Sequence, residues 1–199
     1  MTETAGIQLW LVRHGRTEWA RSGRHTGRTD VPLDDVGRTQ ARALAPLLAG
    51  LHPAQVYSSP LARARQTCEL AGFGEYAQLD DRLMEWDYGS LEGRTTLEMR
   101  ADHPGWLIWD GFEGGESIEQ VAARATSFLA PLRAGDDTVL VFAHGHLLRI
   151  MTACWLGLPP DSARLLVLDP ASVSLLEAKD GQPAIKAWNR APEPGSGAH

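Results

Sequence analysis

Two histidines in this chain of 199 residues each stand at the end of a short apolar run. His14 follows the run 7–12 and Arg13, and His144 follows the run 138–143. If both runs are parallel strands of one sheet, both histidines lie at its carboxyl edge, where open α/β folds place their sites. A neutral imidazole is a good nucleophile toward phosphorus, so the pair predicts phosphoryl chemistry. The alternative is that each histidine is only a structural loop residue.

Arginines that could bind an anion cluster near the first histidine in the sequence. Guanidinium groups hold phosphate oxygens bidentately. The formal net charge of −6 argues against a nucleic-acid surface and favours a local anion site. We expect at least two members of this cluster to be merely solvated. The cluster comprises Arg13, Arg16, Arg21, Arg24 and Arg28.

The composition predicts one domain. A hydrophobic content of 43% over 199 residues suffices for a single core, which we assign to residues 1–190, with a disordered tail at 191–199. Cys68 and Cys154 form no CxxC pair, no signal peptide is recognised before Ile7, and no apolar run is long enough to span a membrane. We therefore expect a cytoplasmic chain with no membrane partner.

A helix is predicted after residue 34, with Asp34 as its N-cap. Its apolar residues follow helical spacing, and Pro46 within them should kink or shorten the helix. These residues are Leu44, Leu47, Leu48 and Leu51.

A short strand and a second helix are predicted next. The strand covers 55–58, and Ser59 with Pro60 reads as an N-cap followed by proline at the first helical position. Arg63 then falls in the first turn, where free N–H groups and the helix dipole favour an anion. Arg63 can therefore complete the anion site, unless it is an exposed helical arginine.

The rest of the chain continues the alternation of strands and helices. Ser117 and Gln120 form a capping box for a helix through Leu132, and a helix through Trp155 follows the strand 138–143. Residues 173–178 and 184–188 read as an edge hairpin. This order predicts an α/β fold with a mostly parallel sheet.

Five sequence blocks and the final His144-Gly145 resemble, in the same order, motifs of the histidine phosphatase superfamily. The branch they resemble includes cofactor-dependent phosphoglycerate mutases and small-molecule phosphatases. The resemblance implies a phosphoglycerate mutase-like, three-layer α/β/α sandwich with a mostly parallel central sheet. The matching blocks are residues 11–19, 26–37, 59–67, 85–93 and 114–117, followed by His144 and Gly145.

The resemblance also implies roles for individual residues. His14 would take up the phosphoryl group, and Arg13, Arg63 and His144 would hold its oxygens. Glu85 would be the proton donor.

The chemistry independently needs such an acid, because an alkoxide is a poor leaving group. Glu85 would have to carry a proton near neutral pH, which we expect from burial beside Trp86 or Tyr88. The alternative is an exposed carboxylate in an ion pair.

Substrate contacts are implied for Thr17, Thr26, Gly27 and Gly145. Ala20 stands where the family often has asparagine, so the resemblance does not carry over one phosphate hydrogen bond to this position. His144-x-His146 could suggest a metal, but no carboxylates or cysteines complete a ligand set. We therefore expect no metal and no cofactor.

The resemblance implies that mutases of this family carry an additional basic insertion after the acid block. Between Gly93 and Gly114 this chain has only Arg94 and Arg100, which favours hydrolysis. Residues 106–109 in the same region are rich in tryptophan. The two tryptophans either pack on a helix or form a substrate lid.

We therefore predict a metal-independent phosphomonoester hydrolase that acts on small phosphorylated metabolites, sugar phosphates or bisphosphates, through a phosphohistidine. The alternatives are a cofactor-dependent phosphoglycerate mutase and a non-catalytic relative that binds phosphorylated ligands. The expected partner is a small phosphorylated substrate and not nucleic acid, and a homodimer is left open.

Overall fold

The computed structural model describes residues 6–132, 137–179 and 181–192. The predicted tail therefore lies almost entirely outside the described residues. Within these ranges no helix is both long enough and apolar enough to cross a membrane.

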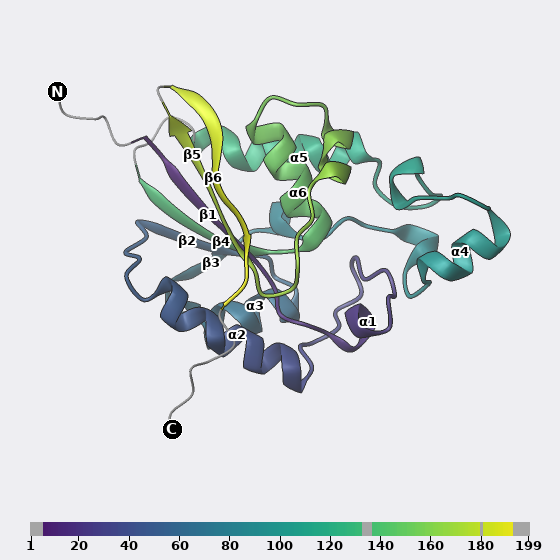
Figure 1. Ribbon diagram of the computed structural model, residues 1–199, viewed down its shortest axis with the longest axis horizontal. Coiled ribbons are helices and arrows are strands. Elements are labelled where there is room, and N and C mark those ends of the chain that lie inside the picture. Colours follow the sequence, from purple (N-terminus) through teal and green to yellow (C-terminus); the bar gives the residue numbers. More distant parts are fainter. Residues whose placement is uncertain (1–5, 133–136, 180, 193–199) are drawn as a thin grey trace.

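One six-stranded sheet forms the centre of the molecule, in the order β3-β2-β4-β1-β5-β6 (Figure 1). Neighbours from β3 to β1 pair in parallel, whereas β5 and β6 are antiparallel, so the prediction of a mostly parallel sheet is confirmed. The strands are β1 (Gln8–Arg13), β2 (Gln55–Ser58), β3 (Ala77–Leu79), β4 (Thr138–Ala143), β5 (Val173–Lys179) and β6 (Gln182–Arg190).

Helices cover both faces of this sheet and complete a three-layer sandwich. In Figure 1, α2 and α3 lie on one face and α5 and α6 on the other, and each pair contributes to a separate cluster of buried apolar side chains. The α-helices are α1 (Glu18–Arg21), α2 (Asp35–Leu48), α3 (Ala62–Leu70), α4 (Thr96–Asp102), α5 (Ile118–Leu132) and α6 (Gly145–Trp155). Short 3₁₀ turns occupy Gly74–Tyr76, Asp81–Leu83, Gly89–Leu91, Ile108–Asp110 and Pro160–Leu165.

Local caps begin α2 and α5, as predicted. The Asp34 carboxylate accepts a hydrogen bond from the Gly37 N–H at 2.7 Å. Ser117 and Gln120 exchange the two bonds of a capping box, at 2.7 and 3.3 Å. Pro46 lies in the last turn of α2, which ends two residues later at Leu48. The predicted hairpin is also confirmed, with β6 at the sheet edge.

The predicted start of α3 is wrong. The helix begins at Ala62, so Ser59 is not its N-cap. A carboxylate oxygen of Asp30, from a distant loop, instead accepts the Ala62 N–H at 2.7 Å. The hydroxyl oxygen of Ser59 lies 2.7 Å from the Nε2 atom of His144. Arg63 still falls in the first turn, as predicted.

Candidate active site

Strand register brings the two histidines together. In the β1–β4 pair, Arg13 stands opposite Ala143, so His14 and His144 leave adjacent strands at the same carboxyl edge. Their ring centroids are 5.2 Å apart, with the ring planes inclined at 61°. The prediction that they meet at this edge is confirmed.

His14 is held as a neutral imidazole with one nitrogen free. Its Nδ1 lies 2.7 Å from the Gly15 carbonyl oxygen, which can only accept, so Nδ1 carries the hydrogen. Burial, and then the charges of Arg63 and Arg13, lower the pKa of His14 well below its ordinary value. Nε2 therefore carries an unprotonated lone pair, as a nucleophile requires.

His144 is also neutral, but both of its nitrogens bind protein groups. Nδ1 accepts from Arg63 Nε at 3.2 Å, so Nε2 carries the hydrogen and donates to Ser59 Oγ at 2.7 Å. Burial, followed by the charge of Arg63, lowers the pKa of His144 well below its ordinary value. Its ring is inaccessible to solvent and stands behind His14.

Arg63 is fully buried, and its remaining donors bind backbone carbonyls. Nη1 donates to Thr29 O at 3.0 Å, and Nη2 donates to Gly27 O at 2.8 Å and Thr26 O at 3.3 Å. Arg63 thus ties residues 26–29 to α3 and orients His144. That it also holds phosphate oxygens stays a prediction.

One cavity of about 310 Å³ lies against His14. Of the residues predicted for the site, those that line it are Arg13, His14, Thr17, Thr26, Glu85 and Gly145. Arg63, His144 and Gly27 do not line it. Lining side chains for which the sequence predicted no substrate contact include His25, Tyr88, Arg149, Leu168 and Pro170.

Three residues with predicted substrate contacts, Thr17 and Thr26 at the cavity wall and Gly27 behind it, also have local structural roles. Thr17 Oγ1 caps α1 by accepting from Ala20 N–H at 3.1 Å, and Thr26 Oγ1 donates to the Arg24 carbonyl at 3.2 Å. Gly27 is needed for close packing, because a Cβ there would lie 2.3 Å from the carbonyl oxygen of Trp86.

Cationic side chains give the cavity a positive character. Arg13 donates through Nη1 to the Leu168 carbonyl, while its buried Nε has no hydrogen-bond partner among the described residues. Arg149 lies one helical turn after Gly145, a spacing that could have predicted its place at the site. Its guanidinium lies over the Trp109 ring, 4.8 Å from the centroid.

Of the other four arginines in the predicted cluster, one lines the cavity and three form ion pairs. Arg24 lines the cavity and donates to the Gly93 carbonyl at 2.8 Å. The other three form ion pairs, Arg16 with Asp34, Arg21 with Glu18 and Arg28 with Glu116, of which the Arg21 pair is exposed.

Glu85 is buried at the N-terminus of α6, so the alternative of an exposed carboxylate is wrong. Oε1 accepts from the N–H groups of Trp86 and Leu147, each at 2.9 Å, and Oε2 accepts from His146 N–H at 3.0 Å. These three backbone donors hold the carboxyl group of Glu85 in one orientation at the cavity wall. That Glu85 is the proton donor stays a prediction.

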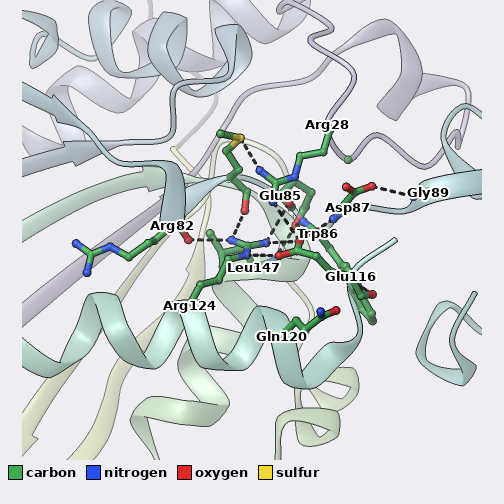
Figure 2. A network of polar contacts seen from close by, with 12 residues as sticks. Arg28, Arg82, Glu85, Trp86, Asp87, Gly89, Glu116, Gln120, Arg124 and Leu147 are labelled. Carbon is green, nitrogen blue, oxygen red and sulfur yellow. Dashed lines mark hydrogen bonds and ion pairs between the residues drawn. The ribbon is translucent and has the colours of Figure 1, made fainter. Parts of the chain in front are cut away.

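An arginine on α5 fixes the segment that carries Glu85 (Figure 2). Arg124 donates to the carbonyls of Arg82, Met84 and Glu85 at 2.6–3.1 Å. It also donates twice to Glu116, whose Oε2 accepts the Asp87 N–H at 3.0 Å. Residues 82–87 are thus bound to α5 at several points.

His146 is part of an aromatic cluster. Its Nδ1 lies 2.6 Å from the Tyr88 hydroxyl, and its ring centroid is 5.1 Å from that of Trp109. Trp109 packs on α6, where its ring contacts the imidazole of His146 and the guanidinium of Arg149, whereas Trp106 packs on the His25 ring. Neither tryptophan lines the cavity. Packing on a helix is therefore confirmed for Trp109, and a role of residues 106–109 as a substrate lid stays a prediction. No group of metal-binding side chains is found in the part of the chain that the structure describes.

Similar proteins include phosphatases and mutases. An acid phosphatase of Mycobacterium tuberculosis is 39% identical over 194 residues, which cover 94% of this chain and 95% of the relative. A sedoheptulose 1,7-bisphosphatase of Saccharomyces cerevisiae is 36% identical, covering 74% of this chain and 67% of its own. A probable phosphoglycerate mutase of Salmonella paratyphi C is 32% identical, covering 92% of this chain and 90% of its own.

The fold has a close counterpart among solved structures. The structure of an open reading frame of Mycobacterium tuberculosis matches with a TM-score of 0.87 at 36% identity, covering 94% of this chain and 98% of that one. The family model described as histidine phosphatase superfamily (branch 1) matches residues 9–191. The phosphatase assignment and the phosphoglycerate mutase-like fold are thereby confirmed. The chain belongs to branch 1 of the histidine phosphatase superfamily.

Proposed function

We propose that this chain hydrolyses sugar phosphates or sugar bisphosphates through a phosphohistidine on His14, without a metal. The observation that carries the proposal is the state of His14. Its Nδ1 hydrogen is bound by the Gly15 carbonyl, and the unprotonated Nε2 belongs to a side chain at the cavity wall, beside Arg13. Nitrogen can therefore attack phosphorus without first losing a proton.

The reaction has two steps. In the first, His14 Nε2 forms a bond to phosphorus, the bond to the ester oxygen breaks, and Glu85 gives its proton to that oxygen. In the second, Glu85 takes a proton from water, the water oxygen attacks phosphorus, and the N–P bond breaks to release inorganic phosphate. Glu85 thus returns to its protonated state, and His14 to its neutral state.

The charge of the cavity supports a substrate with more than one anionic group. Arg13, Arg24 and Arg149 line it, and Glu85 is the carboxylate among its lining residues. A relative named as a sugar bisphosphatase agrees with this charge balance. We propose a sugar bisphosphate as the preferred class of substrate.

A phosphoglycerate mutase is the second candidate, because a relative carries that name. A mutase must retain its phosphorylated intermediate and exclude water. Arg94 and Arg100, the basic residues of the region in question, pair instead with Asp102 and the Trp106 carbonyl, and neither lines the cavity. Hydrolysis is therefore favoured.

The test measures phosphate release from hexose monophosphates, fructose 1,6-bisphosphate and sedoheptulose 1,7-bisphosphate. Conversion of 3-phosphoglycerate to 2-phosphoglycerate is followed in parallel. We expect the bisphosphates to give the highest kcat/KM, and phosphate release to exceed isomerisation. Faster isomerisation than release would instead establish the mutase.

A further inference from the structure

We propose that Tyr88 fixes the tautomer of His146, so that the Nε2–H of His146 donates a hydrogen bond to an oxygen of the sugar part of the substrate. His146 would thus be a specificity-determining residue, and Tyr88 its positioning residue. This inference rests on the proposed function for its substrate, while the tautomer itself can be tested separately.

The contact between the two side chains is short and sheltered. Tyr88 Oη and His146 Nδ1 are 2.6 Å apart, and Tyr88 is only 2% exposed. The rings of Trp86 and Trp109 pack around the imidazole, with centroids 6.0 and 5.1 Å away. The imidazole is therefore held in one orientation.

Both members of the pair are neutral. Burial, and then the charges of Arg149 and Arg13, lower the pKa of His146 well below its ordinary value. Burial, and then the charge of Glu85, raise the pKa of Tyr88 well above its ordinary value. A neutral imidazole carries one N–H and a neutral tyrosine one O–H, so a single hydrogen lies between Oη and Nδ1.

Two arrangements of that hydrogen are conceivable. If Tyr88 donates, Nδ1 accepts and Nε2 carries the other hydrogen of the pair. If Nδ1 donates, the Tyr88 hydroxyl hydrogen has no acceptor among the described residues, in a side chain that is almost fully buried. A buried donor without a partner is unfavourable, because it loses its hydrogen bonds to water and gains none in return. In the first arrangement the hydrogen without a protein acceptor is the one on His146 Nε2, and His146 is less buried than Tyr88. We therefore assign the arrangement in which Tyr88 donates to Nδ1.

The position of His146 determines what Nε2 can reach. His146 lines the cavity, and within the described ranges no hydrogen bond is made by its Nε2. Its own backbone N–H binds Glu85 Oε2 at 3.0 Å, so His146 stands next to the group that protonates the leaving oxygen. A donor there lies on the side of the sugar and not of the transferred phosphoryl group.

The tautomer can be read directly by ¹⁵N NMR of histidine-labelled protein. The chain has 7 histidines, so the His146 signals are identified by their loss in His146→Gln. We expect a protonated Nε2 and an unprotonated Nδ1, and a mixture of tautomers in Tyr88→Phe. A protonated Nδ1, or a doubly protonated ring, in the wild-type protein near neutral pH would overturn the proposal.

Kinetics test the consequence for substrate. Tyr88→Phe and His146→Leu should lower kcat/KM for the best sugar phosphate by roughly tenfold, the worth of one hydrogen bond whose partner is left unpaired. The loss should be smaller for phenyl phosphate, whose leaving group has no further oxygen. His146→Gln should recover part of the loss, because its amide N–H lies near the position of Nε2.

Tyr57→Phe is the matched control. Tyr57 donates to Gln55 Oε1 at 2.7 Å on β2 and does not line the cavity, so its variant should keep wild-type kinetics. Equal losses on both substrates in Tyr88→Phe, or no rescue by glutamine, would overturn the specificity role. If the wild-type protein hydrolyses neither substrate, the proposed function fails, and the specificity role falls with it. The NMR result still decides the tautomer.

Discussion

Hydrogen positions at the site are set by the partner of each imidazole. The Gly15 carbonyl holds the hydrogen of His14 on Nδ1, and Arg63 Nε forces that of His144 onto Nε2. Burial first, and the neighbouring guanidinium charges second, lower the pKa values of both rings. One imidazole thus presents a lone pair to the cavity, while the other is a fixed support behind it.

Glu85→Gln tests the proton donor at the scale of one residue. Loss of a general acid should lower kcat for an alkyl sugar phosphate by about 10²–10⁴-fold. The loss should be much smaller for p-nitrophenyl phosphate, because p-nitrophenolate leaves without a proton. Steady-state kinetics on both substrates measure this, with Glu113→Gln, at an exposed position, as the control. Equal losses on both substrates would contradict the role.

Sequence reasoning located residues whose place depends on a strand end. His14 and His144 could be predicted to meet because each follows a strand of the same parallel sheet. The contacts of Arg63 with three backbone carbonyls could not, because they depend on how residues 26–29 fold against α3. The pairing of Tyr88 with His146 likewise joins positions that no sequence spacing relates.

At the scale of elements, α3 depends on a loop for its start. Asp30 accepts the Ala62 N–H at 2.7 Å, and α3 carries Arg63. Asp30→Ala should lower the free energy of unfolding by about 1 kcal/mol, the usual cost of a lost N-cap. Asp30→Asn keeps an oxygen acceptor and should lose less. Urea denaturation compares the three proteins, and equal stability of Asp30→Ala and wild type would refute this cap.

Arg124 on α5 uses all five of its N–H donors, three on carbonyls of the Glu85 segment and two on the carboxylate of Glu116. Lysine keeps the charge but has fewer donors and no planar fork. Arg124→Lys should therefore destabilise the fold by roughly 2–4 kcal/mol and lower kcat. Thermal unfolding and kinetics check this against Arg42→Lys on the exposed side of α2. A variant with wild-type stability would show that the network is dispensable.

Helix starts were predictable where the cap is local. Asp34 and Ser117 each cap the helix that follows them directly, so their types and spacing suffice. The start of α3 was predicted wrongly because Ser59 is bound to His144 and the cap comes from Asp30. A remote cap leaves no signal in the neighbouring sequence.

At the scale of the whole molecule, buried histidines couple stability to pH. Burial first, and arginine charges second, lower the pKa values of His14, His144 and His146 in the folded chain. Below about pH 6.5 the unfolded chain therefore binds more protons than the folded chain. The contribution of these histidines to the free energy of unfolding is fully present above that pH and is lost as the pH falls.

Urea titrations at about pH 7.5 and about pH 5.5 test this coupling. The free energy of unfolding should be smaller at the lower pH, and His146→Gln should reduce the difference. His52→Gln, at an exposed histidine, is the control. Greater stability at the lower pH would contradict the prediction.

The fold class followed from the alternation of strands and helices, but the cavity joins parts of the whole chain. Its walls come from the loop after β1, the Glu85 segment, the start of α6 and the loop before β5. The side chains that set its size and charge, such as Arg149 and Leu168, meet only through packing. The shape and charge of the cavity could therefore not be predicted from the sequence.

The most direct measurement is trapping of the covalent intermediate. Wild-type protein is mixed with ³²P-labelled sugar phosphate in excess chelator, quenched within milliseconds, and digested for mass spectrometry. We predict an acid-labile, alkali-stable phosphoryl group on His14 and, in His14→Ala, neither label nor phosphate release. Label on another residue, or undiminished turnover by His14→Ala in chelator, would contradict the account.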